Sequence, residues 1–499
     1  MDTPSYHGER LSSTEKQAIR ISYPGIAARL DRLPSGTWHR KVMFLFGGVV
    51  FCDCLDMYVG GGILAQLLQN GWSTVDLNAV FASITMIGYL LGALFAGYLG
   101  DQFGRRKSLL FSTMLFSVMT FLAAFAPTME TLIVMRGLMG VGLGGALPGS
   151  YGALSEYTPP LVRGRYASWL GLIGNFSPPL GALLTVLVIP IFGWQAIFIG
   201  ISLISLLAWL ILWRYLPESP RWLASKGRCA EANEIVLSAE RSFLQQGIEL
   251  PEIDYAALLK TTQQEPTKKA NWLSLFSKRM VKQTIAISAA LFAMNLMVYT
   301  ITNWTPTIFV LRGKDTTMSI GITVVMLLGA PFGIFLLSIF ADKHDRKKGL
   351  IICLFLLAIF AYVWSLIPMD NIFALMSVGF IVCAILYYYA ILACSVYLGE
   401  GFPTEIRLRG SGFAHAIGRL AGIISPYAIA FLLQSYGAPA VFLTNGAVLI
   451  VLAIIIGFCG EETRGKSLEE INASTSSEQR CRSIKKPRTQ TVKFEHEVF

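Results

Sequence analysis

Charged residues are scarce in this chain of 499 residues. Asp, Glu, Lys and Arg together make up 14% of it, whereas hydrophobic residues make up 54%. Soluble globular domains carry about 25% charged residues, and disordered chains are poor in apolar ones. The composition therefore fits neither class, and lipid is the natural solvent for most of the chain.

The groupings that catalysis or metal binding would need are also missing. The five histidines are scattered, and there is no metal-ligand spacing, nucleophile elbow or phosphate loop. The glycine-rich run from Gly140 to Gly145 lies inside an apolar stretch with no strand before it, so it does not indicate a dinucleotide site. We expect no enzyme activity, no metal and no bound cofactor.

Cleavable leaders and disulfides are not expected either. The chain is polar and of mixed charge up to Lys41, so the first apolar span has to serve as the targeting signal. Six of the eight cysteines fall in apolar stretches and the other two in segments predicted to be cytoplasmic.

Long apolar stretches are abundant. A membrane-spanning helix needs about 20 apolar residues to cross roughly 30 Å of hydrocarbon. Twelve stretches qualify: 42–68, 77–99, 108–127, 131–153, 166–190, 195–215, 284–309, 318–341, 349–368, 371–397, 411–435 and 438–459. We predict an all-α polytopic membrane protein with twelve transmembrane helices in two six-helix halves, the fifth of them broken or kinked at Pro178 and Pro179.

The polar segments divide the chain further. The predicted parts are an N-terminal segment (1–41), a first six-helix half (42–216), a central loop (217–283), a second half (284–459) and a tail (460–499). Within the central loop, Ala230 to Leu244 has the pattern of an amphipathic helix lying on the cytoplasmic face.

The net charge of +10 is sorted by side of the predicted membrane and does not gather with aromatics, so we expect no nucleic-acid partner. Loops on one side hold most Lys and Arg, whereas the opposite loops hold only Arg312 and Lys314. This asymmetry predicts that both termini are cytoplasmic.

Two motifs of the first half return in the second at nearly the same distance. Residues 97–107 return in degraded form as residues 338–348, an offset of 241. Glu156 returns as Glu400, an offset of 244, with an arginine seven residues later in each case. Nearly equal offsets for two unrelated motifs indicate duplicated halves.

The same motifs resemble those of the major facilitator superfamily. Residues 97–107 resemble its loop signature, residues 136–148 its fourth-span signature, and residues 217–223 and 462–470 the segments that close each half in sugar porters. The resemblance implies transport by alternating access, performed by a single chain in the bilayer on a small-molecule substrate.

Within the superfamily, Asp53 and Asp56 are similar to the paired aspartates of aromatic-acid/proton symporters and nicotinate transporters, and Gly418-Arg419 resembles their eleventh span. Residues 28–34 and 408–413 look like those of bacterial inner-membrane metabolite transport proteins. The glutamine pair and Gly-Pro-Trp element of sugar porters are absent. The resemblance implies uptake of a small organic acid, aromatic acids included, coupled to the proton. The alternatives are a proton-antiport exporter of drugs or metabolites, and a carrier of a neutral solute such as a sugar.

Asp53 and Asp56 are the residues in greatest need of explanation. Asp53 falls roughly 16 Å into the first span, and a spacing of three puts both carboxylates on one helix face. Burial and mutual repulsion favour protonation of one of them, as proton coupling requires. The alternative is a structural pair neutralised by an arginine. The resemblance implies that Arg136 contacts these acids, for coupling or as a structural anchor.

Arg419 falls roughly 13 Å into the eleventh span, and its guanidinium suits bidentate hydrogen bonding to a carboxylate. Its alternative role is a permanent ion pair with an acid. His415, one turn earlier, could extend the polar site or hold helices together. Asn295, Tyr299 and Tyr388 are the further candidates for substrate contact, although at most two of the consecutive tyrosines 387–389 can face one cavity.

Charged residues at the cytoplasmic ends of the spans resemble the family's inner gate of salt bridges, which would act on conformation and not on substrate. These residues are Asp101, Arg105, Arg106, Glu156, Arg163, Glu218, Asp342, Arg346, Glu400 and Arg407.

Overall fold

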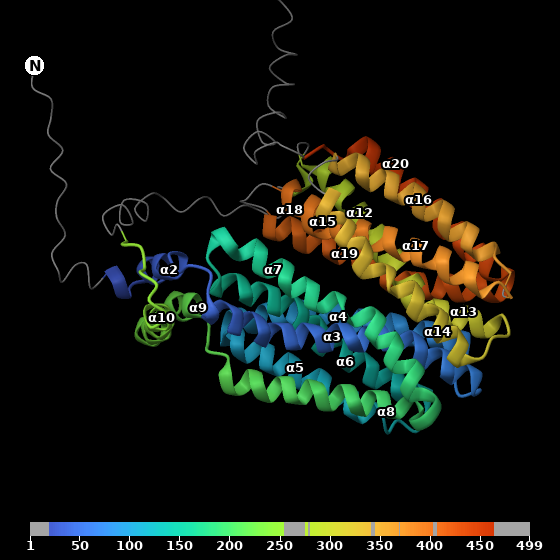
Figure 1. The fold of residues 1–499 in the computed structure, drawn as a ribbon, viewed down its shortest axis with the longest axis horizontal. Coiled ribbons are helices and arrows are strands. Elements are labelled where there is room, and N and C mark those ends of the chain that lie inside the picture. Colours follow the sequence, from blue (N-terminus) through green and yellow to red (C-terminus); the bar gives the residue numbers. More distant parts are fainter. Residues whose placement is uncertain are drawn as a thin grey trace, which may run out of the picture.

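The computed structural model is an all-helical bundle (Figure 1) and describes residues 19–253, 275–277, 280–340, 345–368, 370–402 and 407–463. Ten of its helical segments are long and apolar enough to cross a membrane. One of them, Val162–Tyr215, has 54 residues and reverses at Gly193 (φ 77°), so it accounts for two of the predicted spans. The remaining predicted span is α5 (Arg105–Ala123), which begins with three basic residues. The prediction of twelve membrane helices is confirmed.

The helices follow the order expected for two halves (Figure 1). The first half consists of α3 (Thr37–Gln69), α4 (Val75–Phe103), α5, α6 (Met129–Tyr157), α7 (Pro160–Asn175) and α8 (Ser177–Tyr215). The second half consists of α12 (Val281–Tyr299), η2 (Thr300–Trp304), α13 (Thr305–Leu311), α14 (Thr316–Leu327), α15 (Gly329–Phe340), α16 (Arg346–Leu366), α17 (Ile372–Ile391), η3 (Leu392–Tyr397), α18 (Leu398–Gly401), α19 (Arg407–Tyr436) and α20 (Ala438–Cys459). Three short helices, α2 (Tyr23–Asp31), α9 (Pro220–Ser225) and α10 (Cys229–Leu244), lie beyond one end of the first half, which we call the basal end.

Prolines set the breaks within the spans. The fifth span is interrupted between α7 and α8, and Pro178 and Pro179 stand in the first turn of α8, where a missing N–H costs no helical hydrogen bond. The seventh span widens into the π-helical turn η2 just before Pro306. Because proline has no backbone N–H, Pro306 cannot donate to the Thr302 carbonyl four residues earlier.

That carbonyl lies against Gly61 of α3, in the seam where the two halves meet. A Cβ at Gly61 would overlap the Thr302 carbonyl oxygen and lie 3.0 Å from the Cα of Asn303. Nearby, the Gln69 side chain accepts hydrogen bonds from Thr316, and Gln434 donates to Asp76 over 2.8 Å. We call this side, opposite the basal end, the far end. In Figure 1 the ribbons of the two halves lie close at α13 and α14 and diverge toward the basal end.

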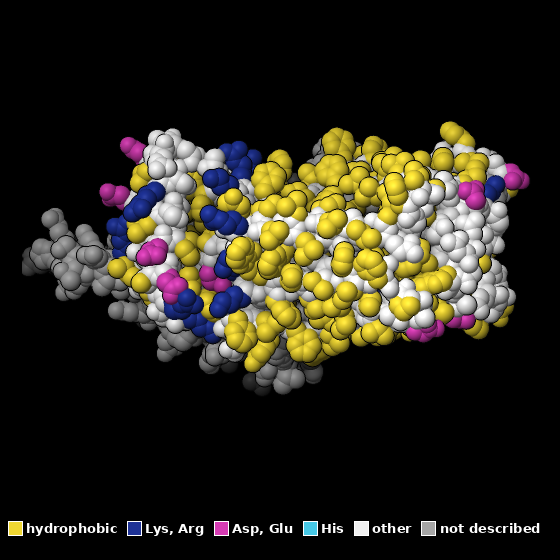
Figure 2. All heavy atoms as spheres, turned by 90° about the horizontal axis from the view of Figure 1, so that it is seen from below, with side chains coloured by type: hydrophobic (Ala, Val, Ile, Leu, Met, Phe, Trp, Pro, Cys, Tyr) yellow, Lys and Arg dark blue, Asp and Glu magenta, His cyan; other side chains and the backbone are white. Residues whose placement is uncertain are grey.

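The surface has the pattern of a membrane protein. Figure 2 shows hydrophobic side chains in a broad band across the face in view, with Lys and Arg gathered toward the basal end. Large apolar side chains of the helices are exposed, as at Phe458 (85%) and Phe373 (83%). Water would disfavour such a surface, whereas lipid tails match it.

Substitution of Gly61 by alanine should prevent the far end from closing. The added methyl meets backbone that cannot move aside, and such overpacking costs about 1–3 kcal/mol. Spin labels at Phe192 and Leu311, both exposed, should therefore report a longer distance in Gly61→Ala by pulsed electron paramagnetic resonance. The neighbouring substitution Gly60→Ala is the control, because its methyl would meet only Arg136 Nη2 at 3.7 Å. Equal distances in both variants would contradict this account of the seam.

Candidate functional site

Arg136 of α6 and Asp56 of α3 form an ion pair in the middle of the first half. Nη1 of Arg136 lies 2.6 Å from Oδ2 of Asp56, and the side chains are 3% and 0% exposed. Nη2 also donates to the Asp56 backbone carbonyl over 3.3 Å, and the guanidinium carbon lies 5.2 Å from the centre of the Phe81 ring. A buried charge is costly unless it is paired, so each of these groups stabilises the other.

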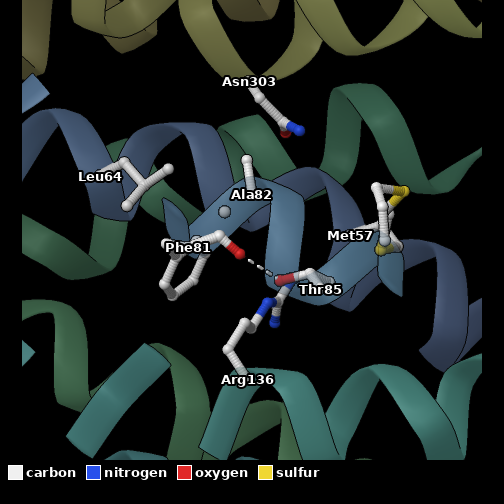
Figure 3. A pocket seen from close by; sticks show the side chains of 9 residues that line it. Met57, Leu64, Phe81, Ala82, Thr85, Arg136 and Asn303 are labelled. Atoms are coloured by element: carbon white, nitrogen blue, oxygen red, sulfur yellow. Dashed lines mark hydrogen bonds between the residues drawn. The ribbon is translucent and has the colours of Figure 1, made fainter. Parts of the chain in front are cut away.

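The pair is not fully satisfied. Among the described residues, neither Nε of Arg136 nor Oδ1 of Asp56 has a hydrogen-bond partner. Arg136 lines a small pocket together with Thr85 and Asn303, and Figure 3 shows Arg136 and Asn303 reaching toward it from opposite sides. The pocket has room for about one water molecule. It is the place where the ion pair of the first half meets a polar side chain of the second.

Asp53 lies one turn before Asp56 and is 1% exposed. The charges near it are those of Asp56, Arg419 and Arg136, and the Tyr89 hydroxyl is the polar group beside it. Its Oδ1 has no hydrogen-bond partner among the described residues. The structure therefore brings both aspartates and both predicted arginines into one charged group at the centre of the bundle.

Arg419 is not neutralised as Arg136 is. Its guanidinium carbon lies 3.9 Å from the centre of the Tyr89 ring, so a side chain of the second half stacks on one of the first. Within the part of the chain that the structure describes, no carboxylate lies at salt-bridge distance from it. The permanent ion pair considered from the sequence is not found there.

The other predicted contact residues divide into two groups. Nε2 of His415 lies 3.9 Å from the Cys394 sulfur, and the Tyr299 ring packs against Gly422 one turn past Arg419. Asn295 donates to the Leu291 carbonyl of its own helix over 2.8 Å and is 8% exposed. These residues lie along the packing of α12, η3 and α19 and border Arg419.

Tyr388 lies apart from this group. Its electrostatic neighbours are Cys353 and Arg346 of α16, away from Arg419. The preceding residue, Tyr387, faces the first half, and its hydroxyl donates to that of Tyr58 over 3.1 Å. Tyr387 therefore reaches the seam between the halves, whereas the sequence analysis favoured Tyr388 as a substrate contact.

The gate residues of the first half form a connected network at the basal end. Arg105 contacts Asp101 over 2.6 Å and Glu156 over 2.7 Å, and the Ser219 hydroxyl donates to Glu156. Glu218 accepts from the backbone N–H of Arg106 over 3.0 Å, at the start of α5. A carboxylate at a helix N-terminus satisfies a free N–H and stabilises the helix dipole.

The second half repeats this network at nearly the same sequence offset. Arg346 lies 3.6 Å from Glu400, and Glu462 accepts from the backbone N–H of Arg346 over 2.8 Å and of Lys347 over 3.0 Å. Glu462 follows Glu218 by 244 residues, the offset already seen for Glu156 and Glu400. The described ion pairs of both networks join helices within one half.

Three predicted gate residues stand outside these networks. Arg163 donates to the Thr158 carbonyl over 3.3 Å and makes no hydrogen bond or ion pair to Glu156 among the described residues. Asp342 and the side chain of Arg407 lie outside the described residues.

Residues 40–474 match the family described as "Sugar (and other) transporter". The chain belongs to this family. It is therefore a multi-pass membrane transporter of the major facilitator type and not an enzyme.

Two relatives extend over nearly the whole transporter. It is 38% identical to the inner membrane metabolite transport protein YdjE of Escherichia coli, over 90% of this chain and 99% of that protein. It is 30% identical to the niacin transporter NiaP of Acinetobacter baylyi, over 89% and 99%. The xylose transporter XylE of E. coli, in a partially occluded inward-open conformation, has the same fold, with a TM-score of 0.69 and 19% identity over 86% of this chain and 100% of XylE.

Sequence reasoning missed three residues that the transporter's structure brings into these sites. Tyr89 and Tyr58 lie in apolar spans, where nothing in the local sequence separates a site tyrosine from a core tyrosine. Glu462 could have been found, because it stands at the repeat offset from Glu218, which was predicted as a gate residue.

A small second core joins the segment before the first span to the central loop. Its apolar members include Ile26 and Leu30 of α2, Trp222 of α9, and Val236 and Phe243 of α10. The amphipathic helix predicted at residues 230–244 is thus present as α10, and its apolar face packs on α2 and α9.

Arg29 and Glu240 fix this core. Arg29 is fully buried and contacts both oxygens of Glu240, over 3.0 and 2.7 Å, while Arg32 contacts the same carboxylate over 2.6 Å. Burial opposes ionisation of Glu240, but the hydrogen bonds and charges of the two arginines outweigh it and hold its pKa below the usual value. Arg221 of α9 ties the core to the gate, since it contacts Asp31 and donates to the Glu156 carbonyl over 3.0 Å.

Glu240→Gln should loosen this core. Loss of the charged hydrogen bonds should cost about 2 kcal/mol at pH 7 and speed hydrogen exchange in α2 and α10. The contact stabilises the protein above the ordinary carboxylate pKa and is lost as the pH falls through the lowered pKa of Glu240, so variant and wild type should converge in acid. Glu231→Gln on the exposed side of α10 is the control and should exchange like wild type. A difference between Glu240→Gln and wild type that persists in acid would contradict the assignment.

Proposed function

We propose that this transporter imports a small organic carboxylate, with aromatic acids among its substrates, together with a proton. The observation that carries the proposal is Arg419, a guanidinium at the centre of the bundle with no anionic partner among the described residues. Arg136, the other arginine of the central group, already has Asp56. A substrate carboxylate would supply the charge that Arg419 lacks.

Charge balance at the centre favours joint binding of anion and proton. Asp53 and Asp56 carry two negative charges when ionised, and Arg136 and Arg419 carry two positive ones. Protonation of one aspartate leaves the group with one net positive charge, which favours binding of an anion by Coulomb attraction in a medium of low dielectric constant. By linkage, a bound anion equally favours protonation. Symport follows from this reciprocity.

The relatives support the substrate class and the membrane. NiaP is named for transport of niacin, an aromatic carboxylic acid, and YdjE is named as an inner membrane protein. We propose the bacterial inner membrane for this chain too, with both termini cytoplasmic, because Lys and Arg gather near the basal end (Figure 2). In that orientation the conformation described above is closed toward the outside.

Substitution of Arg419 tests carboxylate recognition. Arg419→Lys retains the charge but loses the planar two-pronged donor set, so the KM for acid uptake should rise about tenfold, and Arg419→Ala should raise it further. The measurement is uptake of radiolabelled nicotinate and 4-hydroxybenzoate into proteoliposomes with an acidic exterior. Uptake of xylose and of a cationic dye is measured alongside, to represent neutral and cationic substrates. Arg214→Lys, on an exposed arginine, is the matched control.

Unchanged acid uptake by Arg419→Ala would rule out its role in binding. Gradient-driven movement of the dye alone would favour a proton-antiport exporter, and movement of xylose alone a carrier of neutral solutes.

Substitution of the aspartates tests proton coupling. Asn cannot exchange a proton, so Asp53→Asn or Asp56→Asn should abolish accumulation of acid against its gradient. Exchange of labelled for unlabelled acid, which needs no net proton movement, should remain. Uphill accumulation that survives in both single variants would refute the coupling role of this pair.

A further inference from the structure

We propose that Tyr89 is a positioning residue that holds the guanidinium of Arg419 in the orientation in which it binds the substrate carboxylate. This inference rests on the function proposed above and adds to it a residue of α4 that neither the sequence motifs nor the comparisons single out. It stands on the stacked geometry of the two side chains.

The stack leaves the donors of Arg419 free. The five N–H groups of a guanidinium lie in its plane, so a ring that covers one face takes none of them. The guanidinium carbon lies over the Tyr89 ring, 3.9 Å from its centre, which is the distance of a stacked pair, and a stacked guanidinium can present its edge to a bidentate carboxylate. If a carboxylate of the protein bound Arg419, its N–H donors would no longer be available to the substrate.

Tyr89 is well placed to act as a fixed platform. Its side chain is 2% exposed, and its backbone carbonyl packs directly on Gly144 of α6, where a Cβ would overlap it. The hydroxyl end of the ring lies beside Asp53. Arg419 has a long side chain with many rotamers, and a rigid surface under it lowers the entropy lost when a ligand fixes its position.

The two residues belong to different halves of the transporter. Tyr89 lies on α4 and Arg419 on α19, helices that also meet through the hydrogen bond from Ser83 to the Ile423 carbonyl, over 2.8 Å. The cation of the second half is therefore oriented by the first. Substrate affinity then depends on contact between the halves as well as on the arginine itself.

The first test separates the ring from the hydroxyl. Tyr89→Leu removes the platform and should raise the KM for nicotinate uptake about tenfold with little change in kcat. Tyr89→Phe and Tyr89→Trp keep an aromatic face and should restore a KM close to that of wild type. A merely structural role would instead lower the amount of folded protein or kcat.

Tyr98→Leu is the matched control, because Tyr98 lies on the same helix and is 64% exposed. Its KM should equal that of wild type. An unchanged KM in Tyr89→Leu, or a KM raised as much in Tyr89→Phe as in Tyr89→Leu, would overturn the proposal.

The second test needs no transport. Phenylglyoxal modifies arginine side chains, and peptide mass spectrometry can follow Arg419 in purified protein without substrate. Removal of the ring that covers one face should speed modification of Arg419 several-fold in Tyr89→Leu and leave it unchanged in Tyr89→Phe. Arg136, buried and paired with Asp56, serves as the internal reference.

Equal rates of Arg419 modification in wild type and Tyr89→Leu would overturn the proposal that the Tyr89 ring supports Arg419. If wild type transports no carboxylate, the proposed function fails, whereas this labelling still decides whether Tyr89 shields Arg419.

Discussion

A charge in the hydrocarbon must be neutralised or solvated, and the buried pair of Asp56 and Arg136 meets this constraint at the centre of the bundle. Its consequences extend to the neighbouring groups. With Arg136 committed to Asp56, neither Asp53 nor Arg419 has an oppositely charged partner at salt-bridge distance in the described part of the chain. Two groups of opposite charge that lie close together without forming an ion pair are what the proposed binding of a proton and an anion would use.

The contacts between the halves are of another kind. At the far end they consist of backbone packing at Gly61 and hydrogen bonds made by amides and hydroxyls, with Asp76 the one ionisable side chain among the residues cited for that seam. At the basal end the described gate ion pairs brace helices within each half. Closure of the far end therefore depends on shape more than on charge, and the Thr302 carbonyl that packs on Gly61 is one to which Pro306 cannot donate.

The sequence predicted the fold well because lipid demands long apolar helices, which are visible as such. The twelve helices and the break at Pro178 follow from composition and from the missing proline N–H. Asp53, Asp56, Arg136 and Arg419 could be selected because charges in apolar spans are rare. The tyrosines could not, since a tyrosine is at home in a helix core, and the side of α17 that faces α3 depends on how the helix is rotated by packing. That rotation turned Tyr387 and not Tyr388 toward the seam.

In the proposed symport, the distribution of charge between the halves would link binding to conformation. Both aspartates and Arg136 lie in the first half, and Arg419 is the cation of the central group that lies in the second. A bound carboxylate on Arg419 cancels a charge in one half, and a proton on Asp53 or Asp56 cancels one in the other. The central group as a whole is neutral when both ligands are bound or neither is, and it carries a net charge in a medium of low dielectric constant when only one is bound, so movement of one half against the other is least costly in the first two states. A carrier that moves readily only in these two states couples its two ligands.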